Sequence, residues 1–258
     1  MKIARSLEEF QELRAQCEDS VGFVPTMGAL HDGHLSLMRL AKDHADTVIV
    51  SIYVNPTQFA PHEDFDAYPR DVDADLAKLE GLADLVFLPR DEDIYPIGQP
   101  ERVAPVSLKA AEGLESDFRP HFFGGVAGVV SRLFEIVTPD VAVFGEKDFQ
   151  QLMVIREMVE TEGFDIEVVG APIARDEHGL ALSSRNAYLS EGELEIARML
   201  NQVIYNVAGN PTEAAFEEAQ HMLLTAGFDK VDYLEQRWGR VLAAAWLGQT
   251  RLIDNCSI

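Results

Sequence analysis

Short apolar segments that alternate with amphipathic ones are the feature that most constrains the fold of this chain. Five segments rich in Val, Ile, Leu and Phe are typical of buried strands, and four segments between them carry apolar residues at helical spacing. Near-continuous apolar strands that alternate with helices indicate an α/β fold, a parallel sheet with helices on both faces. The expected strands span residues 21–25, 47–54, 84–88, 141–145 and 166–171, and the expected helices 33–45, 71–82, 126–137 and 149–162.

The pattern changes after residue 171. Residues 173–190 are polar and rich in turn-forming types, and two amphipathic helices are expected to follow over 191–207 and 213–226. Short strands are expected over 231–234, 240–246 and 250–253. The sequence therefore predicts an α/β domain over residues 1–171 and a small α+β C-terminal cap domain over 172–258.

Composition limits the classes of partner. The chain has 258 residues, 47% of them hydrophobic and 25% charged, which is ordinary for a globular protein. A formal net charge of −23 argues against a nucleic-acid partner, because phosphate backbones would be repelled. No stretch approaches the ~18 consecutive apolar residues that span a bilayer, so no membrane partner is expected. The two cysteines, Cys17 and Cys256, form no metal or redox motif, and we expect a reduced cytoplasmic setting.

The most informative motif is a glycine-punctuated turn with two histidines. The run VGFVPTMGALHDGH, residues 21–34, passes from an apolar strand through this turn into an amphipathic helix, with His31 and His34 at the start of the helix. The unpaired N–H groups and positive dipole end of a helix start bind anions, and imidazoles placed there can donate hydrogen bonds to phosphate. The run predicts a nucleotide site.

Two other interpretations of the histidines remain. A His-x-x-His pair can bind a metal, but a tight zinc site needs further ligands, and the residues between these histidines are Asp32 and Gly33 rather than the Glu of H-E-x-x-H. The histidines can also be ordinary polar turn residues. The run is neither a P-loop nor G-x-G-x-x-G.

Polar residues follow two further strands of the predicted sheet. The segment NPTQF, residues 55–59, comes after the second strand, and GEKD, residues 145–148, comes at the end of the fourth. Ligands of parallel sheets bind beyond the carboxyl ends of the strands, so these segments are expected beside the histidine turn.

Cations in these segments suit a polyphosphate. Lys147 lies where a strand is expected to become a helix, although an exposed Lys paired with Glu146 or Asp148 is an equal alternative from sequence. The loop Ser183-Ser184-Arg185 offers two hydroxyls and a guanidinium, but serine-rich turns are common and this signal is weak alone.

Gln58 and Gln151 are neutral amides within the same segments. Their donors and acceptor fit a hydroxy acid better than a bare phosphate, with ordinary turn polarity as the alternative. No Ser-His-Asp triad or activated nucleophile is indicated. These groups imply adenylyl transfer without a covalent enzyme intermediate, with catalysis by positioning and charge stabilisation.

These motifs resemble those of the pantoate–β-alanine ligase (pantothenate synthetase) family. The resemblance extends over nearly the whole chain and is carried by PTMGALHDGH (25–34), VNPTQF (54–59), FGEKDFQQ (144–151), LSSRN (182–186), WLG (246–248) and RLIDN (251–255). It implies a Rossmann-like member of the HIGH-type nucleotidylyltransferase superfamily, usually a homodimer. The implied reaction condenses (R)-pantoate with β-alanine through a pantoyl adenylate made from Mg²⁺-ATP.

The resemblance also implies roles for individual residues. His34 is implied as proton donor, with His31 and Lys147 as the other catalytic groups. Gln58 and Gln151 are implied to hold pantoate, with Gln58 also near β-alanine. Asp75 is a possible metal-side carboxylate, with a solvated helix start as the more ordinary interpretation. The residues implied to line the ATP site are Met27, Gly28, Ala29, Leu30, His31, Asp32, Gly33, His34, Gly145, Glu146, Lys147, Asp148, Ala174, Leu182, Ser183, Ser184 and Arg185.

The chain departs from the family pattern at one loop. Where the family usually has Arg-Pro-Gly-His-Phe, this chain has RPHFF over residues 119–123, so His121 replaces the usual Gly and Phe122 the usual His. Arg132 stands where Lys is common. Two alternatives therefore remain open: a nucleotide-binding paralogue without ligase activity, and a nucleotidylyltransferase that releases its adenylylated product.

Overall fold

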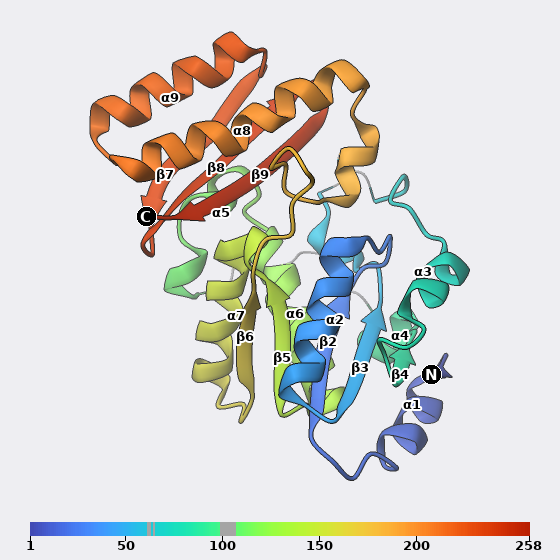
Figure 1. Ribbon diagram of the computed structural model, residues 1–258. Helices are drawn as coiled ribbons and strands as arrows, with labels where there is room; N and C mark the ends of the chain where they lie inside the picture. The colour runs from blue at the N-terminus through green and yellow to red at the C-terminus, as the bar shows by residue number, and fades with distance from the viewer. Residues whose placement is uncertain (61–62, 64, 99–106) are drawn as a thin grey trace. The chain divides into compact units, whose positions relative to one another are not determined.

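The computed structural model describes residues 1–60, 63, 65–98 and 107–258, which form two compact units (Figure 1). The first unit contains Met1–Glu146 and Gln150–Ala171, and the second contains Lys147–Phe149 and Pro172–Ile258. The short segment Lys147–Phe149 therefore belongs to the second unit, although the sequence-based division assigns it to residues 1–171.

The first unit is built on a six-stranded parallel sheet with the strand order β1-β4-β3-β2-β5-β6. This confirms the predicted α/β class. The carboxyl ends of β3, β2 and β5 lie side by side, since these strands are neighbours and run in one direction. The strands are β1 (Lys2–Ala4), β2 (Val21–Thr26), β3 (Thr47–Ile52), β4 (Leu85–Phe87), β5 (Val141–Gly145) and β6 (Glu167–Ala171).

Alternate residues of the central strands face two different helical layers. Val24 of β2 belongs to a core cluster with Met38 and Ala41 of α2. The next residue back, Phe23, packs edge-on against Phe134 of α6, with 6.3 Å between ring centroids. Both faces of the sheet are thus covered, as a parallel sheet requires. The helices of this layer structure are α1 (Leu7–Arg14), α2 (Asp32–His44), α3 (Val72–Leu79), α4 (Asp91–Ile94), α5 (Glu115–Phe118), α6 (Phe122–Val137) and α7 (Phe149–Glu162).

Strand β1 is absent from the sequence prediction. It has three residues, two of them exposed, so no apolar periodicity marks it. It pairs with β4 at the sheet edge, and the following helix α1 is capped by the Ser6 hydroxyl, which accepts a hydrogen bond from the Glu9 N–H. Helix α6 also begins four residues before the predicted start at residue 126.

The second unit has a three-stranded antiparallel sheet, β7 (Lys230–Arg237), β8 (Arg240–Leu247) and β9 (Thr250–Ser257). Helices α8 (Glu191–Gly209) and α9 (Glu213–Ala226) share a buried core with it, to which β8 contributes every second residue from Val241 to Leu247. Strands β7 and β9 are longer than predicted, because backbone pairing with β8 continues through the residues 235–237 and 254–257. The β7–β8 turn is Trp238-Gly239, both with positive φ, as a two-residue hairpin requires. Among the described residues no helix combines the length and apolar character needed to cross a bilayer.

We expect Phe10→Ala to destabilise the first unit by about 3–5 kcal/mol, the usual cost of removing a buried aromatic ring. Phe10 is fully buried, and its ring lies 4.4 Å from that of Phe87 in β4, the partner of the edge strand β1. Urea unfolding measures the loss. The exposed Glu12→Ala on the same helix is the control, and equal stabilities of the two variants would contradict this packing.

Candidate active site

The turn between β2 and α2 holds both histidines of the predicted nucleotide site. Met27 to Leu30 form the turn, and Gly28 and Ala29 both have positive φ, +81° and +51°. His31 is the N-cap of α2, and Asp32 and Gly33 are its first two residues. Two consecutive positive φ values turn the chain sharply, so that β2 runs directly into the helix N-terminus.

The two imidazoles cap the helix through their Nδ1 atoms. His31 Nδ1 accepts a hydrogen bond from the Gly33 N–H at 3.1 Å, and His34 Nδ1 accepts one from the His31 N–H at 3.3 Å. The rings lie 4.2 Å apart between centroids. An Nδ1 that accepts a hydrogen bond carries no proton, so each neutral ring carries its proton on Nε2. Both histidines are therefore set as Nε2–H donors.

Asp75 lies in α3, and it is 3% exposed. Its Oδ2 accepts from the Ala29 N–H at 2.9 Å and its Oδ1 from the Leu30 N–H at 2.7 Å. The interpretation of Asp75 as part of a solvated helix start is therefore wrong: the carboxylate is buried against the histidine turn. Both of its oxygens are occupied by backbone donors, and the described residues hold no cluster of three or more metal-ligating side chains.

Gln58 ends a short 3₁₀ helix, η1 (Pro56–Gln58), after β3. Asn55 fixes this segment: its Oδ1 accepts from the Thr57 N–H and from the Tyr95 hydroxyl, and its Nδ2 donates to the Gly125 carbonyl of α6. A Cβ on Gly125 would lie 2.4 Å from the Thr57 carbonyl oxygen, so the backbones of α6 and η1 meet where only glycine fits.

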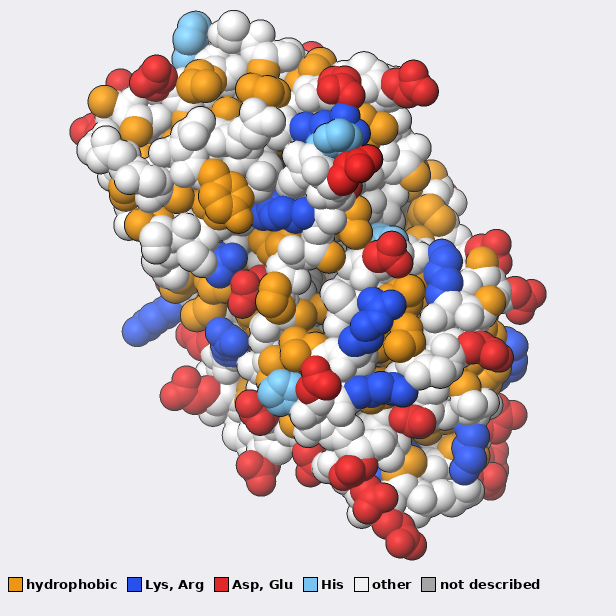
Figure 2. All heavy atoms as spheres, in the orientation of Figure 1, with side chains coloured by type: hydrophobic (Ala, Val, Ile, Leu, Met, Phe, Trp, Pro, Cys, Tyr) orange, Lys and Arg blue, Asp and Glu red, His pale blue; other side chains and the backbone are white. Residues whose placement is uncertain are grey.

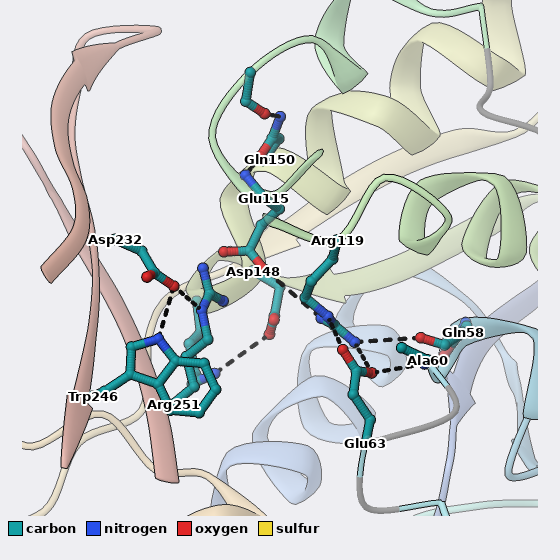
Figure 3. A network of polar contacts seen from close by, with 12 residues as sticks. Gln58, Ala60, Glu63, Glu115, Arg119, Asp148, Gln150, Asp232, Trp246 and Arg251 are labelled. Atoms are coloured by element: carbon teal, nitrogen blue, oxygen red, sulfur yellow. Dashed lines mark hydrogen bonds and ion pairs between the residues drawn. The ribbon is translucent and has the colours of Figure 1, made fainter. Parts of the chain in front are cut away.

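Arg119 links the Gln58 segment to the loop before α6 (Figure 3). Its guanidinium donates to the Gln58 carbonyl at 3.3 Å and pairs with Glu63 at 2.7 and 2.8 Å. Burial raises the pKa of Glu63, but the hydrogen bonds and charge of Arg119 outweigh this effect, so the pKa of that carboxyl lies below its ordinary value. Sequence reasoning missed Glu63, which lies in no distinctive pattern of charge or spacing, and it placed Asn55 in the NPTQF segment without a role of its own.

The neighbouring glutamines of α7 have different environments. Gln150 is 3% exposed and holds the 110–115 loop: its amide donates to the Ala110 and Gly113 carbonyls and its oxygen accepts from the Glu115 N–H (Figure 3). Gln151 is only half-buried. Backbone partners occupy the amide of Gln150, which makes it a structural residue. The other predicted amide, Gln58, is 9% exposed.

In the second unit, Asn255 fixes the segment that carries Lys147. Its Nδ2 donates to the Lys147 carbonyl at 2.9 Å, and its Oδ1 accepts from Arg240 at 2.6 Å. The Lys147 ammonium lies 3.7 Å from the Asp148 carboxylate. This is the neighbour pairing left open by the sequence, but the long distance and partial exposure make it a weak ion pair. Gly145 ends β5 and Glu146 begins the 3₁₀ helix η3 (Glu146–Asp148).

The remaining predicted ATP-site residues lie on one hairpin-like loop of the second unit. The Leu182 N–H donates to the Ala174 carbonyl at 2.9 Å, which joins two of the predicted residues directly. Ser183 caps the 3₁₀ helix η4 (Ser184–Tyr188) by accepting from the Arg185 N–H. Arg175 braces the loop through two hydrogen bonds to the buried Asp254 carboxylate, at 2.7 and 2.9 Å.

Charge also limits how an anion is bound. On the face drawn in Figure 2, acidic side chains are spread over the surface with Lys and Arg side chains among them, in keeping with the net charge of −23. An anionic ligand therefore needs hydrogen-bond donors or cations gathered locally at its site.

Comparison with known proteins decides the family. The sequence profile described as pantoate-beta-alanine ligase matches residues 2–257. The chain belongs to the pantoate-beta-alanine ligase family. It is therefore a ligase of pantothenate synthesis. A pantothenate synthetase from Mesorhizobium japonicum is 52% identical over 270 residues, covering 95% of each protein.

Solved structures agree over the full length. The crystal structure of pantothenate synthetase from Thermus thermophilus matches with a TM-score of 0.91 at 40% identity, covering 100% of this chain and 99% of that one. The pantoate-beta-alanine ligase from Francisella tularensis, complexed with beta-gamma ATP and beta-alanine, matches with a TM-score of 0.89 at 38% identity, covering 100% and 97%.

The departure from the family pattern has a clear local structure. The Phe122 ring lies 3.9 Å from the Arg119 guanidinium carbon, so at this position the ligase has a cation–π contact. His121 precedes α6, and its Nε2 is buried without a hydrogen-bond partner in the described residues. Arg132 makes an ion pair with Glu135 at 3.0 Å on the exposed side of α6.

We expect Gly125→Ala to destabilise the ligase by about 1–3 kcal/mol, because the added methyl group forces α6 and η1 apart. Gly128→Ala is the matched control: it lies on the same helix, is exposed, and its Cβ would meet nothing within 4 Å. Helix propensity should make the control neutral or stabilising by up to about 1 kcal/mol. Similar unfolding curves for both variants would refute the close approach.

We expect the Glu63–Arg119 pair to make stability pH-dependent. Because the folded-state pKa of Glu63 is lowered, its contribution is full above the unfolded value of ~4.3 and is lost as the pH falls through the folded value. Glu63→Gln should cost about 1.5–3 kcal/mol at neutral pH. Urea unfolding at several pH values should show that the difference in unfolding free energy between Glu63→Gln and wild type becomes smaller in acid. A difference that does not change with pH would contradict the assignment. Glu12→Gln is the control.

Proposed function

We propose that this chain condenses (R)-pantoate with β-alanine in an ATP-dependent reaction that passes through a pantoyl adenylate. The observation that carries the proposal is the double imidazole cap, in which His31 and His34 each use Nδ1 for a backbone N–H at the start of α2. Two Nε2–H donors and a helix N-terminus suit the phosphates of a nucleotide. The Francisella tularensis relative complexed with beta-gamma ATP and beta-alanine supports the same substrates.

In the first half-reaction, a pantoate carboxylate oxygen attacks the α-phosphorus of ATP and diphosphate leaves. The His31 and His34 Nε2–H groups and the Lys147 ammonium stabilise the negative charge that builds on the phosphate oxygens. Gln58 and Gln151 orient the hydroxy acid through amide hydrogen bonds. The ATP-site residues of the second unit in this proposal are Lys147, Asp148, Ala174, Leu182, Ser183, Ser184 and Arg185.

In the second half-reaction, the β-alanine amine attacks the acyl carbon of the adenylate, AMP leaves, and the new amide nitrogen loses a proton. Gln58 lies next to both acids in this proposal. The described residues contain no preformed cluster for a resident metal, and both Asp75 oxygens accept backbone hydrogen bonds. A Mg²⁺ ion would therefore arrive with the triphosphate, whose oxygens it prefers.

The direct test is release of AMP and diphosphate from Mg²⁺-ATP and pantoate, with and without β-alanine. Amine-dependent AMP with pantothenate as co-product supports the ligase. Diphosphate without AMP, at a rate that β-alanine does not change, would favour a nucleotidylyltransferase, and no diphosphate at all would favour an inactive paralogue. The homodimer and the cytoplasmic location stay predictions; light scattering on the purified protein tests the first.

We expect His34→Ala to slow diphosphate release by at least about a hundredfold, as loss of a transition-state donor should. The fold should survive, since loss of the capping hydrogen bond to the His31 N–H costs only about 0.5–2 kcal/mol. His44→Ala, an exposed histidine in the last turn of the same helix, is the control. A near-normal rate for His34→Ala would remove this residue from the mechanism.

A further inference from the structure

We propose that Asp75 and Lys78 of α3 are positioning residues that set the His34 imidazole for adenylate formation. The proposal rests on the function proposed above. It starts from one peptide group, the Leu30–His31 peptide, whose two polar atoms both have side-chain partners. The Lys78 ammonium donates to the Leu30 carbonyl at 2.6 Å, and the His31 N–H donates to His34 Nδ1 at 3.3 Å. The same peptide plane therefore joins α3 to the His34 ring.

Asp75 fixes the peptide groups immediately before this one. Its carboxylate accepts from the Ala29 and Leu30 N–H groups at 2.9 and 2.7 Å, and a Cβ on Gly28 would lie 2.9 Å from its Oδ2. Ala29 has a φ of +51°, a conformation that a non-glycine residue keeps only when its surroundings impose it. The carboxylate supplies that constraint. Leu30 is 2% exposed, so water cannot easily replace these partners.

The spacing on α3 explains how two residues can hold the turn between β2 and α2. Asp75 and Lys78 are three residues apart, so they project from one face of the helix. Asp75 accepts hydrogen bonds from the turn and Lys78 donates one to it. Together they fix the position and the tilt of the peptide planes in the turn. A misplacement of about 1 Å at a catalytic group costs on the order of a hundredfold in rate.

The most informative substitution is Asp75→Asn. Its Oδ1 can accept from one backbone N–H, but its amide group would place donors against the other. We expect Asp75→Asn to lower the kcat of diphosphate release on the order of a hundredfold while the KM for pantoate stays close to wild type. Asp73→Asn, an exposed residue on the same helix, is the matched control and should behave as wild type.

Raising the Mg²⁺ concentration separates positioning from metal binding. A metal ligand would be rescued by excess Mg²⁺, whereas a positioning residue would not. The proposal would be overturned if high Mg²⁺ restored the kcat of Asp75→Asn, or if Asp75→Asn already had the wild-type kcat at ordinary Mg²⁺. Lys78→Met covers the case in which Asp75→Asn does not fold: its kcat should fall roughly tenfold, the effect of one lost charge-assisted hydrogen bond. A wild-type kcat for Lys78→Met would equally overturn the proposal.

Failure of the proposed function would be visible separately. Calorimetric binding of inorganic diphosphate, measured with EDTA present, reports on the turn without any turnover. One result would contradict the proposed function and still support the positioning role. In that result the wild-type protein makes no AMP but binds diphosphate, and Asp75→Asn binds diphosphate at least about tenfold more weakly than Asp73→Asn does. Equal binding by both variants would count against the positioning role.

Discussion

The hydrogen bonding of a few backbone N–H groups between β2 and α2 is the constraint on which the rest of the proposed site depends. A helix start leaves its first N–H groups without partners. At the start of α2 the His31 ring accepts from the Gly33 N–H. In the turn before the helix, Asp75 accepts from the Ala29 and Leu30 N–H groups, and the His34 ring accepts from the His31 N–H. The residues that stabilise the turn thus include the histidines proposed to act on ATP. A substitution of either histidine is therefore expected to affect both the cap of α2 and the proposed reaction.

The substrate-binding segment after β3 depends on a different constraint, close approach. Gly125 lets α6 touch the backbone of Thr57, while Asn55 and Arg119 hold the ends of the same short segment. Because β2 and β3 are paired in parallel from Val21 to Thr26, the two segments emerge at one edge of the sheet. The sheet therefore fixes their separation, and the local contacts fix their orientation.

The sequence predicts the parallel sheet, the second α+β unit and the family, because apolar periodicity and the ordered motifs between residues 25 and 255 carry that information. It misses β1, since three residues cannot display a period, and it starts α6 too late, because Phe122 to Gly125 contain two glycines that lower helix propensity. It treats Asp75 as solvated, because the run DVDAD over residues 71–75 looks the same in sequence whether Asp75 faces water or the backbone of a turn. Long-range partners such as Asn255 for the Lys147 carbonyl have no local signature.

The measurement that tests this account most directly is the tautomeric state of His31 and His34. Long-range proton–nitrogen correlation spectra of the nitrogen-labelled protein, in mildly alkaline buffer, distinguish the protonated ring nitrogen from the unprotonated one, with His34→Ala and His44→Ala for assignment. The account predicts that both rings carry their proton on Nε2, because both Nδ1 atoms accept backbone hydrogen bonds. A proton on Nδ1 of either ring would contradict the cap, and with it the proposed donors to phosphate.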